Sequence, residues 1–131
     1  MNMEEVFEKV SEVIVDASDV EADEISLDKR LIDDLDIDSI DMMELIYSIE
    51  KIYGVELEIG DFEGAMNREM NGVPFAKDNI ITDEGLQKLR ELMPEVDQAK
   101  IQPGLAVYNV PFLFTVESLC KLIMRKSAAK N

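Results

Sequence analysis

Apolar residues recur every three or four positions along much of this chain, which is the spacing of amphipathic helices. The first such stretch predicts a helix of about four turns over residues 3–17. Its apolar stripe consists of Val6, Val10, Val13, Ile14 and Ala17, with Phe7 beside it. A long connection follows over residues 18–38, and its scattered apolar residues are expected to pin it onto a core.

The second predicted helix has the clearest boundaries. Asp38 precedes it as the expected N-cap, because its carboxylate can accept hydrogen bonds from backbone N–H groups one turn later. Gly54 ends it at a position where a left-handed backbone is commonly needed. Six residues are expected to form its apolar side: Ile40, Met43, Leu45, Ile46, Ile49 and Ile52.

The rest of the chain predicts shorter elements. A short helix is plausible over residues 59–69, although two glycines weaken it, and residues 71–74 form a turn signal. A capped helix is expected over residues 82–93 and a final helix over residues 115–126, with an irregular, proline-rich segment at 94–111 between them. Since no strand-like alternation is sustained, the sequence predicts an all-α bundle.

Composition narrows the possible partners. Of 131 residues, 29 are acidic and 13 basic, for a formal net charge of −16. A polyanion repels nucleic acids and anionic membranes, so proteins with basic docking faces are the expected partners, without nucleic-acid binding or membrane insertion.

With no bilayer-length apolar run and an acidic start, a cytoplasmic protein is predicted, and a monomer is expected. The single cysteine, Cys120, is expected on the buried side of the last helix.

The negative charge is concentrated in one part of the chain. Between Asp19 and Glu44, eleven acids and two bases give a local net charge of −9. Such a run is commonly a solvated face, and composition alone favours that interpretation. The alternative is an electrostatic docking site for a basic partner.

The sequence Asp38-Ser39-Ile40 stands between this acidic connection and the start of the second helix. It resembles the prosthetic-group site of acyl carrier proteins, where the pattern is Asp-Ser-Leu. Leu35 upstream, and Glu44, Glu50 and Gly54-Val55 downstream, also match the family pattern. The resemblance extends over roughly residues 1–70 and 112–126, with family-like first and last helices.

The resemblance implies that Ser39 carries a 4′-phosphopantetheine arm derived from coenzyme A, with Asp38 beside it in the site. The arm would hold acyl groups as thioesters for biosynthetic enzymes, in a specialised fatty acid, lipid or polyketide-like pathway. It also implies a carrier that is not itself an enzyme. The implied partners are a phosphopantetheinyl transferase and acyl-loading, condensing or acyltransferase enzymes.

The helix after Ser39 resembles the recognition helix of this family. Six of its residues are implied in partner recognition: Ile40, Asp41, Met43, Glu44, Tyr47 and Glu50. The acids would face basic residues of a partner, and the apolar side chains would add contacts. Alternatively, the acids serve only solubility, and Ile40 and Met43 belong to the core.

The resemblance is interrupted because most acyl carrier proteins run almost directly from their third helix into the last. We therefore expect one acyl carrier domain over residues 1–126, an insertion at about 71–114, and a disordered tail at 127–131. The enlargement resembles that of specialised bacterial acyl carriers. The insertion could cover an unusual acyl group, form a dedicated partner surface, or only pack on the bundle.

Other candidate chemistry is weak. Asp34, Asp36 and Asp38 have the one-three-five spacing of a calcium loop, but Ser39 stands where glycine is needed and Leu45 where glutamate is needed. Without histidine, no Ser-His-Asp or Cys-His set can form. No metal site is assigned, and two alternatives to a carrier are an acidic helical adaptor without a prosthetic group and a weak cation-binding regulator.

Overall fold

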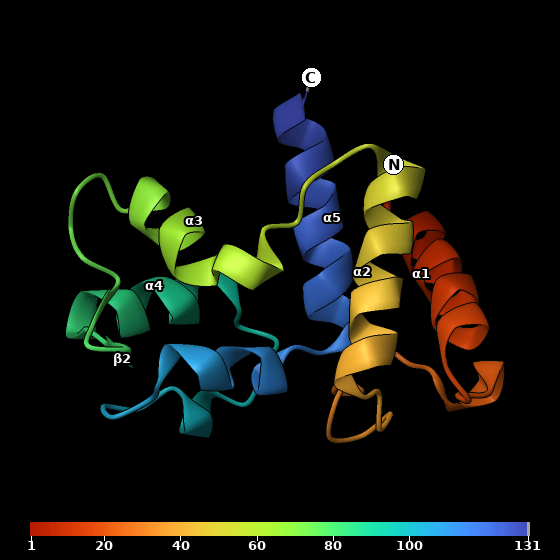
Figure 1. Ribbon diagram of the computed structural model, residues 1–131, viewed down its shortest axis with the longest axis horizontal. Coiled ribbons are helices and arrows are strands. Elements are labelled where there is room, and N and C mark those ends of the chain that lie inside the picture. The colour runs from red at the N-terminus through yellow and green to blue at the C-terminus, as the bar shows by residue number, and fades with distance from the viewer. Residues whose placement is uncertain (131) are drawn as a thin grey trace. The chain divides into compact units, whose positions relative to one another are not determined.

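The helices predicted from the apolar spacing are present in the computed structural model, which describes residues 1–130 (Figure 1). They are α1 at Met3–Ala17, α2 at Ser39–Tyr53, α3 at Phe62–Glu69, α4 at Asp83–Leu92 and α5 at Val116–Lys130. Short 3₁₀ helices, η1 to η4, lie at Ala22–Glu24, Ile59–Asp61, Gln98–Lys100 and Val107–Leu113. The mostly helical chain confirms the predicted fold class. None of the described helices is both long and apolar enough to cross a membrane.

The chain divides into two compact units. Unit 1 combines residues 1–57 with the chain from Phe114 onward, and unit 2 is Glu58–Leu113. The end of unit 2 at Leu113 coincides with the end of the predicted insertion. Unit 2 begins at Glu58, however, whereas the insertion is predicted to begin at about residue 71. Helix α3, which the sequence assigns to the carrier core, therefore belongs to the same unit as the inserted residues.

Unit 1 is built around α1, which packs against both α2 and α5 (Figure 1). The apolar stripe that predicts α1 is its buried face, as expected for a surface helix with one face toward a core. The buried side chains of the three helices include Val6, Val10, Val13, Ile14, Leu45, Ile49, Val116, Leu119, Cys120 and Ile123.

The connection between α1 and α2 is fixed to the start of α5. The N–H of Leu31 donates to the carbonyl of Phe114 at 3.0 Å, and the N–H of Val116 donates to the carbonyl of Lys29 at 2.9 Å. The side chains of Leu31 and Leu35 are buried. The prediction that apolar residues pin this connection is therefore confirmed.

The predicted apolar side of α2 is wrong in part. Ile40, Met43 and Ile52 are 74, 73 and 50 % exposed, whereas Leu45 and Ile49 are buried. The physical reason is that α2 meets the rest of unit 1 along one narrow stripe. Because each residue advances the helix by about 100°, residue 40 lies about 180° and residue 43 about 120° around the helix axis from residue 49.

The end of the chain also differs from the prediction. Where a disordered tail is expected at 127–131, α5 continues through Ser127 to Lys130, and Asn131 lies outside the described residues. Alanines at 128 and 129 have the highest helix propensity, which favours continuation of the helix.

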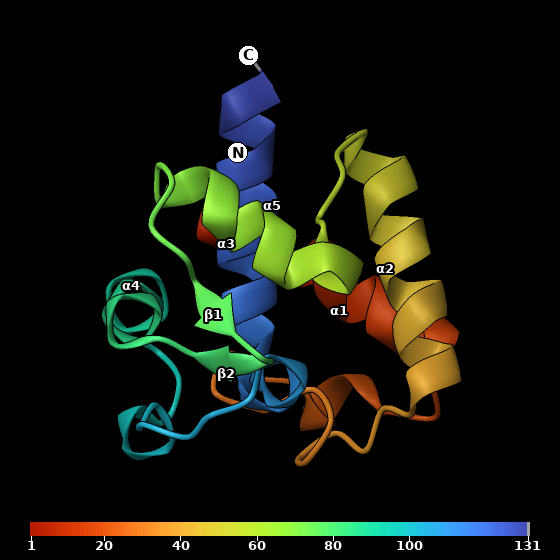
Figure 2. The same cartoon turned by 60° about the vertical axis from the view of Figure 1, so that its left-hand side comes forward.

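Unit 2 contains a hairpin that the sequence did not predict. Strands β1 (Ala76–Lys77) and β2 (Ile80–Ile81) pair antiparallel between α3 and α4 in the chain (Figure 2). The two loop residues, Asp78 and Asn79, have φ of 53° and 67°, as a type I′ turn requires. Strands of two residues are too short to produce a detectable alternation.

The interior of unit 2 is formed around Phe75, which is fully buried and meets the ring of Phe62 edge-on at 5.6 Å. Thr82 caps α4 as predicted, because its hydroxyl accepts from the N–H of Gly85 at 3.0 Å. The segment predicted to be irregular contains η3 and most of η4 rather than an α-helix. The inserted residues are therefore folded.

Cys120 provides a chemical probe of unit 1. It is fully buried, as predicted, and burial together with the nearby Glu117 raises the pKa of its thiol to about 12. Because the thiolate is the reactive form, we expect a disulfide-exchange reagent near pH 8 to label the native protein about 100-fold or more slowly than the denatured chain. Similar labelling rates in buffer and in denaturant would contradict this burial.

Candidate functional site

Ser39 is the first residue of α2, and its side chain is exposed. Asp38 is the N-cap, as predicted: its Oδ1 accepts from the N–H of Asp41 at 2.8 Å. The carbonyl of Asp38 accepts from the N–H of Met42 at 2.9 Å. The start of α2 is therefore well defined, and the Ser39 hydroxyl projects from a fixed helix end.

The start of α2 can also receive an anion attached to Ser39. Within residues 1–130, the N–H groups of Ser39 and Ile40 have no hydrogen-bond partner, as is usual for the first turn of a helix. The positive end of the helix dipole lies at the same place. An exposed hydroxyl beside open N–H groups fits the phosphodiester of a 4′-phosphopantetheine arm.

The residues before Ser39 hold it in position from within unit 1. Leu35 and Ile37 are buried, and the N–H of Ile37 donates to the carbonyl of Leu31 at 3.2 Å. Between them, Asp36 has φ of 56°, a left-handed conformation that acidic side chains tolerate better than most. Buried side chains two and four residues before the serine therefore fix the approach to the helix.

A clamp between Arg30 and Asp34 closes the preceding turn. The Asp34 carboxylate accepts from the backbone N–H of Arg30 at 2.8 Å and from its Nη2 at 3.2 Å. These hydrogen bonds, with the positive charge of Arg30, lower the pKa of Asp34. Asp34, one of the acids between Asp19 and Glu44, therefore stabilises the loop through Arg30, and its carboxylate is already occupied by these hydrogen bonds.

The carboxylates around the start of α2 form an anionic cluster. The pKa of Asp41 is raised, first by partial burial and then by the negative charges of Asp38, Asp19 and Glu44. Negative charges this close together repel one another, and a positive charge beside them would lower that repulsion. These carboxylates would also repel a phosphodiester at this end of the helix.

An exposed apolar stripe runs along α2 from its start. It consists of Ile40, Met43 and Tyr47, and Tyr47 is 62 % exposed. Lys51 extends it, with its Nζ 5.4 Å from the centre of the Tyr47 ring. We call these three apolar residues the α2 stripe. The alternative that Ile40 and Met43 belong to the core is wrong.

The two glutamates of α2 differ in their surroundings. Glu44 is exposed next to the α2 stripe. Glu50 is only partly exposed, and its Oε2 accepts from the backbone N–H of Leu57 at 2.9 Å. The Glu50 carboxylate therefore fixes the chain after α2, whereas Glu44 projects into solvent.

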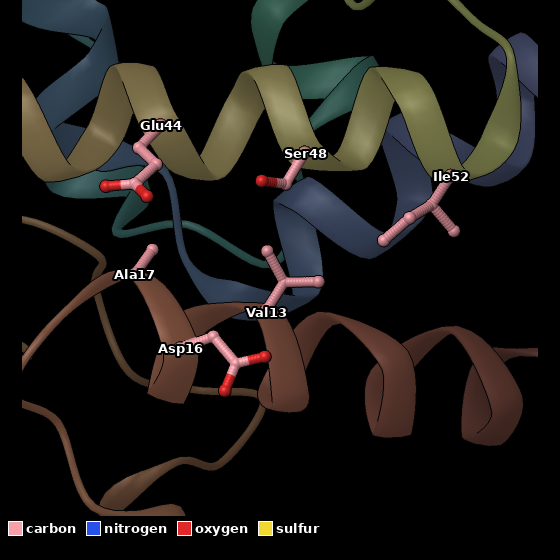
Figure 3. A pocket seen from close by; sticks show the side chains of 6 residues that line it. All are labelled: Val13, Asp16, Ala17, Glu44, Ser48 and Ile52. Carbon is pink, nitrogen blue, oxygen red and sulfur yellow. The ribbon is translucent and has the colours of Figure 1, made fainter.

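A shallow groove of about 170 Å³ lies between α1 and α2 (Figure 3). Its lining residues are Val13, Asp16, Ala17, Glu44, Ser48 and Ile52. Figure 3 shows Glu44 and Ala17 toward one end of the groove and Ile52 toward the other, with the Asp16 carboxylate directed away from α2. The sequence did not predict it, because a groove depends on how two helices pack.

The calcium-loop spacing does not correspond to a metal centre in the structure. Across residues 1–130, no group of three or more acidic or cysteine side chains is arranged to hold a metal ion. Asp34, one of the three spaced acids, is instead bonded to Arg30.

Comparison with known proteins gives consistent matches. The family model described as a phosphopantetheine attachment site matches residues 8–67, which include Ser39 and the whole of α2. An acyl carrier protein of Petrotoga mobilis is 37 % identical over 84 residues, which are 64 % of this chain and 98 % of that protein.

Two further relatives match over shorter lengths. The acyl carrier protein AcpXL of Brucella melitensis is 31 % identical over 65 residues, 50 % of this chain and 70 % of that protein. An acyl carrier protein of Tropheryma whipplei is 37 % identical over 57 residues, 44 % of this chain and 70 % of that protein.

Proposed function

This chain belongs to the acyl carrier protein family, and from that premise we propose that Ser39 is the attachment point of its 4′-phosphopantetheine arm. The observation that supports Ser39 most strongly is its exposed position as the first residue of α2, directly after the Asp38 cap and next to open backbone N–H groups. A phosphodiester there extends into solvent without displacing any buried side chain.

Acyl carrier proteins are carriers and not enzymes, and the family holds 4′-phosphopantetheine covalently. When attached, the group supplies a terminal thiol that holds acyl groups as thioesters. This chain supplies the acceptor hydroxyl and a rigid helix end to present it. The sequence has no histidine, and the carboxylate of Asp38 is used as the helix cap, so the base that removes the Ser39 proton is expected from the loading enzyme.

We propose that partner enzymes dock on the start of α2, with the α2 stripe as apolar contact and Asp41 and Glu44 as charge partners. The exposure of the α2 stripe and of Glu44, together with the anionic cluster, supports this role, and large apolar side chains rimmed by charge are typical of binding surfaces. Glu50 is the weaker candidate among the residues implied by the family resemblance, because its carboxylate bonds to Leu57.

Reversing the charge of Glu44 should weaken docking. We expect Glu44→Lys to lower kcat/KM for loading by a phosphopantetheinyl transferase about tenfold at low ionic strength, with a smaller loss at high salt, because exposed charges act through screened, long-range attraction. Glu8→Lys is the matched control: Glu8 is exposed on α1 and does not line the groove between α1 and α2, and the change in net charge is the same. Equal losses in both variants would show that only net charge matters.

We further propose that the cargo belongs to a specialised fatty acid, lipid or polyketide-like pathway. The supporting feature is the folded insertion between α3 and α5, which smaller acyl carriers lack. Mass spectrometry of the protein isolated from its own cells would identify the acyl group on Ser39. Only the common saturated fatty acyl groups at that position would contradict a specialised cargo.

A single loading experiment tests the carrier function against the adaptor alternative. Apo protein is incubated with coenzyme A and a phosphopantetheinyl transferase, and intact mass is recorded. A carrier gains about 340 Da, the mass of the attached arm, and then accepts an acyl group that neutral hydroxylamine removes. A chain that stays unmodified would favour the adaptor.

A further inference from the structure

The methionines of this chain differ widely in their exposure. Of the eight, Met43 is the most exposed, at 73 %, followed by Met1 at 63 %. Met66 and Met93, both in unit 2, are only 3 and 7 % exposed. The other four are partly buried: Met3, Met42, Met70 and Met124. Within the described helices, Met43 is therefore the methionine whose thioether is most open to a dissolved reactant.

Met43 also occupies the middle of the α2 stripe. Ile40 lies three residues before it and Tyr47 four residues after it, so the three side chains share one face of the helix. All three are exposed. Ser39 is one helical turn away, about 6 Å along the axis. A change of polarity at Met43 would therefore alter the centre of this face, close to the start of α2.

A thioether reacts with a peroxide without any further reactant. The Sδ atom attacks one peroxide oxygen, the O–O bond breaks and an S–O bond forms, while the proton of the attacked oxygen moves to the other oxygen, which leaves as water. Sulfur is oxidised by two electrons and the peroxide is reduced by two. The product is methionine sulfoxide, which is polar and is returned to methionine by sulfoxide reductases.

The other sulfur atoms of the folded chain compete poorly for an oxidant. Cys120 is fully buried, and its pKa of about 12 leaves little of the reactive thiolate near neutral pH. Met66 and Met93 react slowly because unit 2 must first open locally. The thiol of an attached arm would compete, so the apo chain is the form in which Met43 reacts early.

We propose that Met43 is a site of reversible oxidation by hydrogen peroxide, and that its sulfoxide weakens the docking of partner enzymes on the α2 stripe. An apolar partner surface that covers the sulfoxide oxygen leaves this strong acceptor without a donor, which opposes binding. The fold is kept, because the side chain lies mostly in solvent. The loss of docking rests on the proposed function, whereas the oxidation itself does not.

The modification is tested on the apo chain with dilute hydrogen peroxide, followed by quenching and peptide mapping. Met43 and Met1 should gain about 16 Da, one oxygen atom, at least about tenfold faster than Met66 and Met93. In denaturant, the four should react at similar rates. Native oxidation of Met43 that is no faster than that of Met66 would overturn the site. A sulfoxide at Met43 that resists both epimer-specific reductases would overturn its reversibility.

Met43→Leu separates this site from the other methionines. Leucine keeps the stripe apolar without sulfur, and Met1 remains as an exposed target. After removal of peroxide, the oxidised wild-type chain should show a transferase KM about fivefold above that of the untreated chain, with kcat unchanged. Reductase treatment should restore it, and oxidised Met43→Leu should keep the KM of its own untreated form. Equal increases in both oxidised chains, or no increase in the wild type, would overturn the effect on docking.

Met43→Gln places a polar group of similar length at this position without any oxidant. It should raise the transferase KM about fivefold while leaving the urea midpoint unchanged, because the side chain is exposed. A KM equal to that of the wild type would contradict the role of polarity here. If the untreated wild-type chain gained no arm, the proposed function would be rejected, while peptide mapping would still decide the oxidation of Met43.

Discussion

Ser39→Ala is expected to abolish the mass gain of about 340 Da that the proposed function predicts for the wild-type chain after incubation with coenzyme A and a phosphopantetheinyl transferase. In the proposed function the Ser39 hydroxyl is the acceptor, and alanine removes it without further change. Ser39 is exposed and the cap is made by Asp38, so the variant should fold normally. We expect its free energy of unfolding to stay within about 0.5 kcal/mol of the wild-type value.

Ser11→Ala is the matched control, because Ser11 lies on α1, outside both the start of α2 and the groove, and its Oγ forms no hydrogen bond within the described residues. It should gain the full mass at the wild-type rate within about twofold. Intact-mass spectrometry measures both variants, and peptide mapping assigns the modified residue. A full mass gain in Ser39→Ala would move the attachment point to another residue and remove the main support for the proposed site.

The start of α2 could be predicted from the sequence because its signals are local. The N-cap residue, an acidic residue in the first turn that interacts with the helix dipole, and the glycine that ends the helix each act on backbone groups only a few residues away. The structure confirms Asp38 as the cap, and Gly54 has the left-handed φ of 63° that ends α2. Ser39 could therefore be placed at the start of α2 before any tertiary contact was known, and the family-like motif around it made it the candidate attachment point.

The exposed surface of α2 could not be predicted in the same way. Apolar spacing identifies a helix, but which apolar residues are buried depends on how many neighbours the helix has. In unit 1, α2 contacts its neighbours along a single stripe, so Ile40 and Met43 remain exposed. The groove was missed for the same reason, since its walls come from residues 13–17 and 44–52 of two different helices.

The importance of Gly85 was also invisible in the sequence, where a glycine near the start of a helix only lowers helix propensity. In the structure, a Cβ at this position would meet the backbone carbonyl of Phe75 and approach the Ile81 Cγ2 to 2.7 Å. That carbonyl accepts from the N–H of Thr82 at 2.9 Å and shares the hydroxyl hydrogen of Thr82 with the carbonyl of Pro74, at 3.0 and 2.8 Å respectively. The close approach of α4 to the hairpin therefore requires glycine.

Gly85→Ala is consequently expected to lower the free energy of unfolding by about 2–3 kcal/mol. The Phe75 carbonyl can move away from the new methyl group only by weakening its bonds to Thr82. It is also restrained from the other side, because the N–H of Phe75 donates to the Asn67 Oδ1 at 2.9 Å. The gain in helix propensity from alanine, about 1 kcal/mol, offsets only part of this loss.

Gly60→Ala is the matched control within unit 2, since a Cβ there would meet nothing within 4 Å. Its free energy of unfolding should equal that of the wild type or exceed it by up to about 1 kcal/mol. Urea denaturation followed by circular dichroism measures both variants. Hydrogen exchange should show lost protection in β2 and α4 of Gly85→Ala, and the Cys120 labelling rate reports separately on unit 1. Equal stability of the two variants would contradict the close contact between α4 and Phe75.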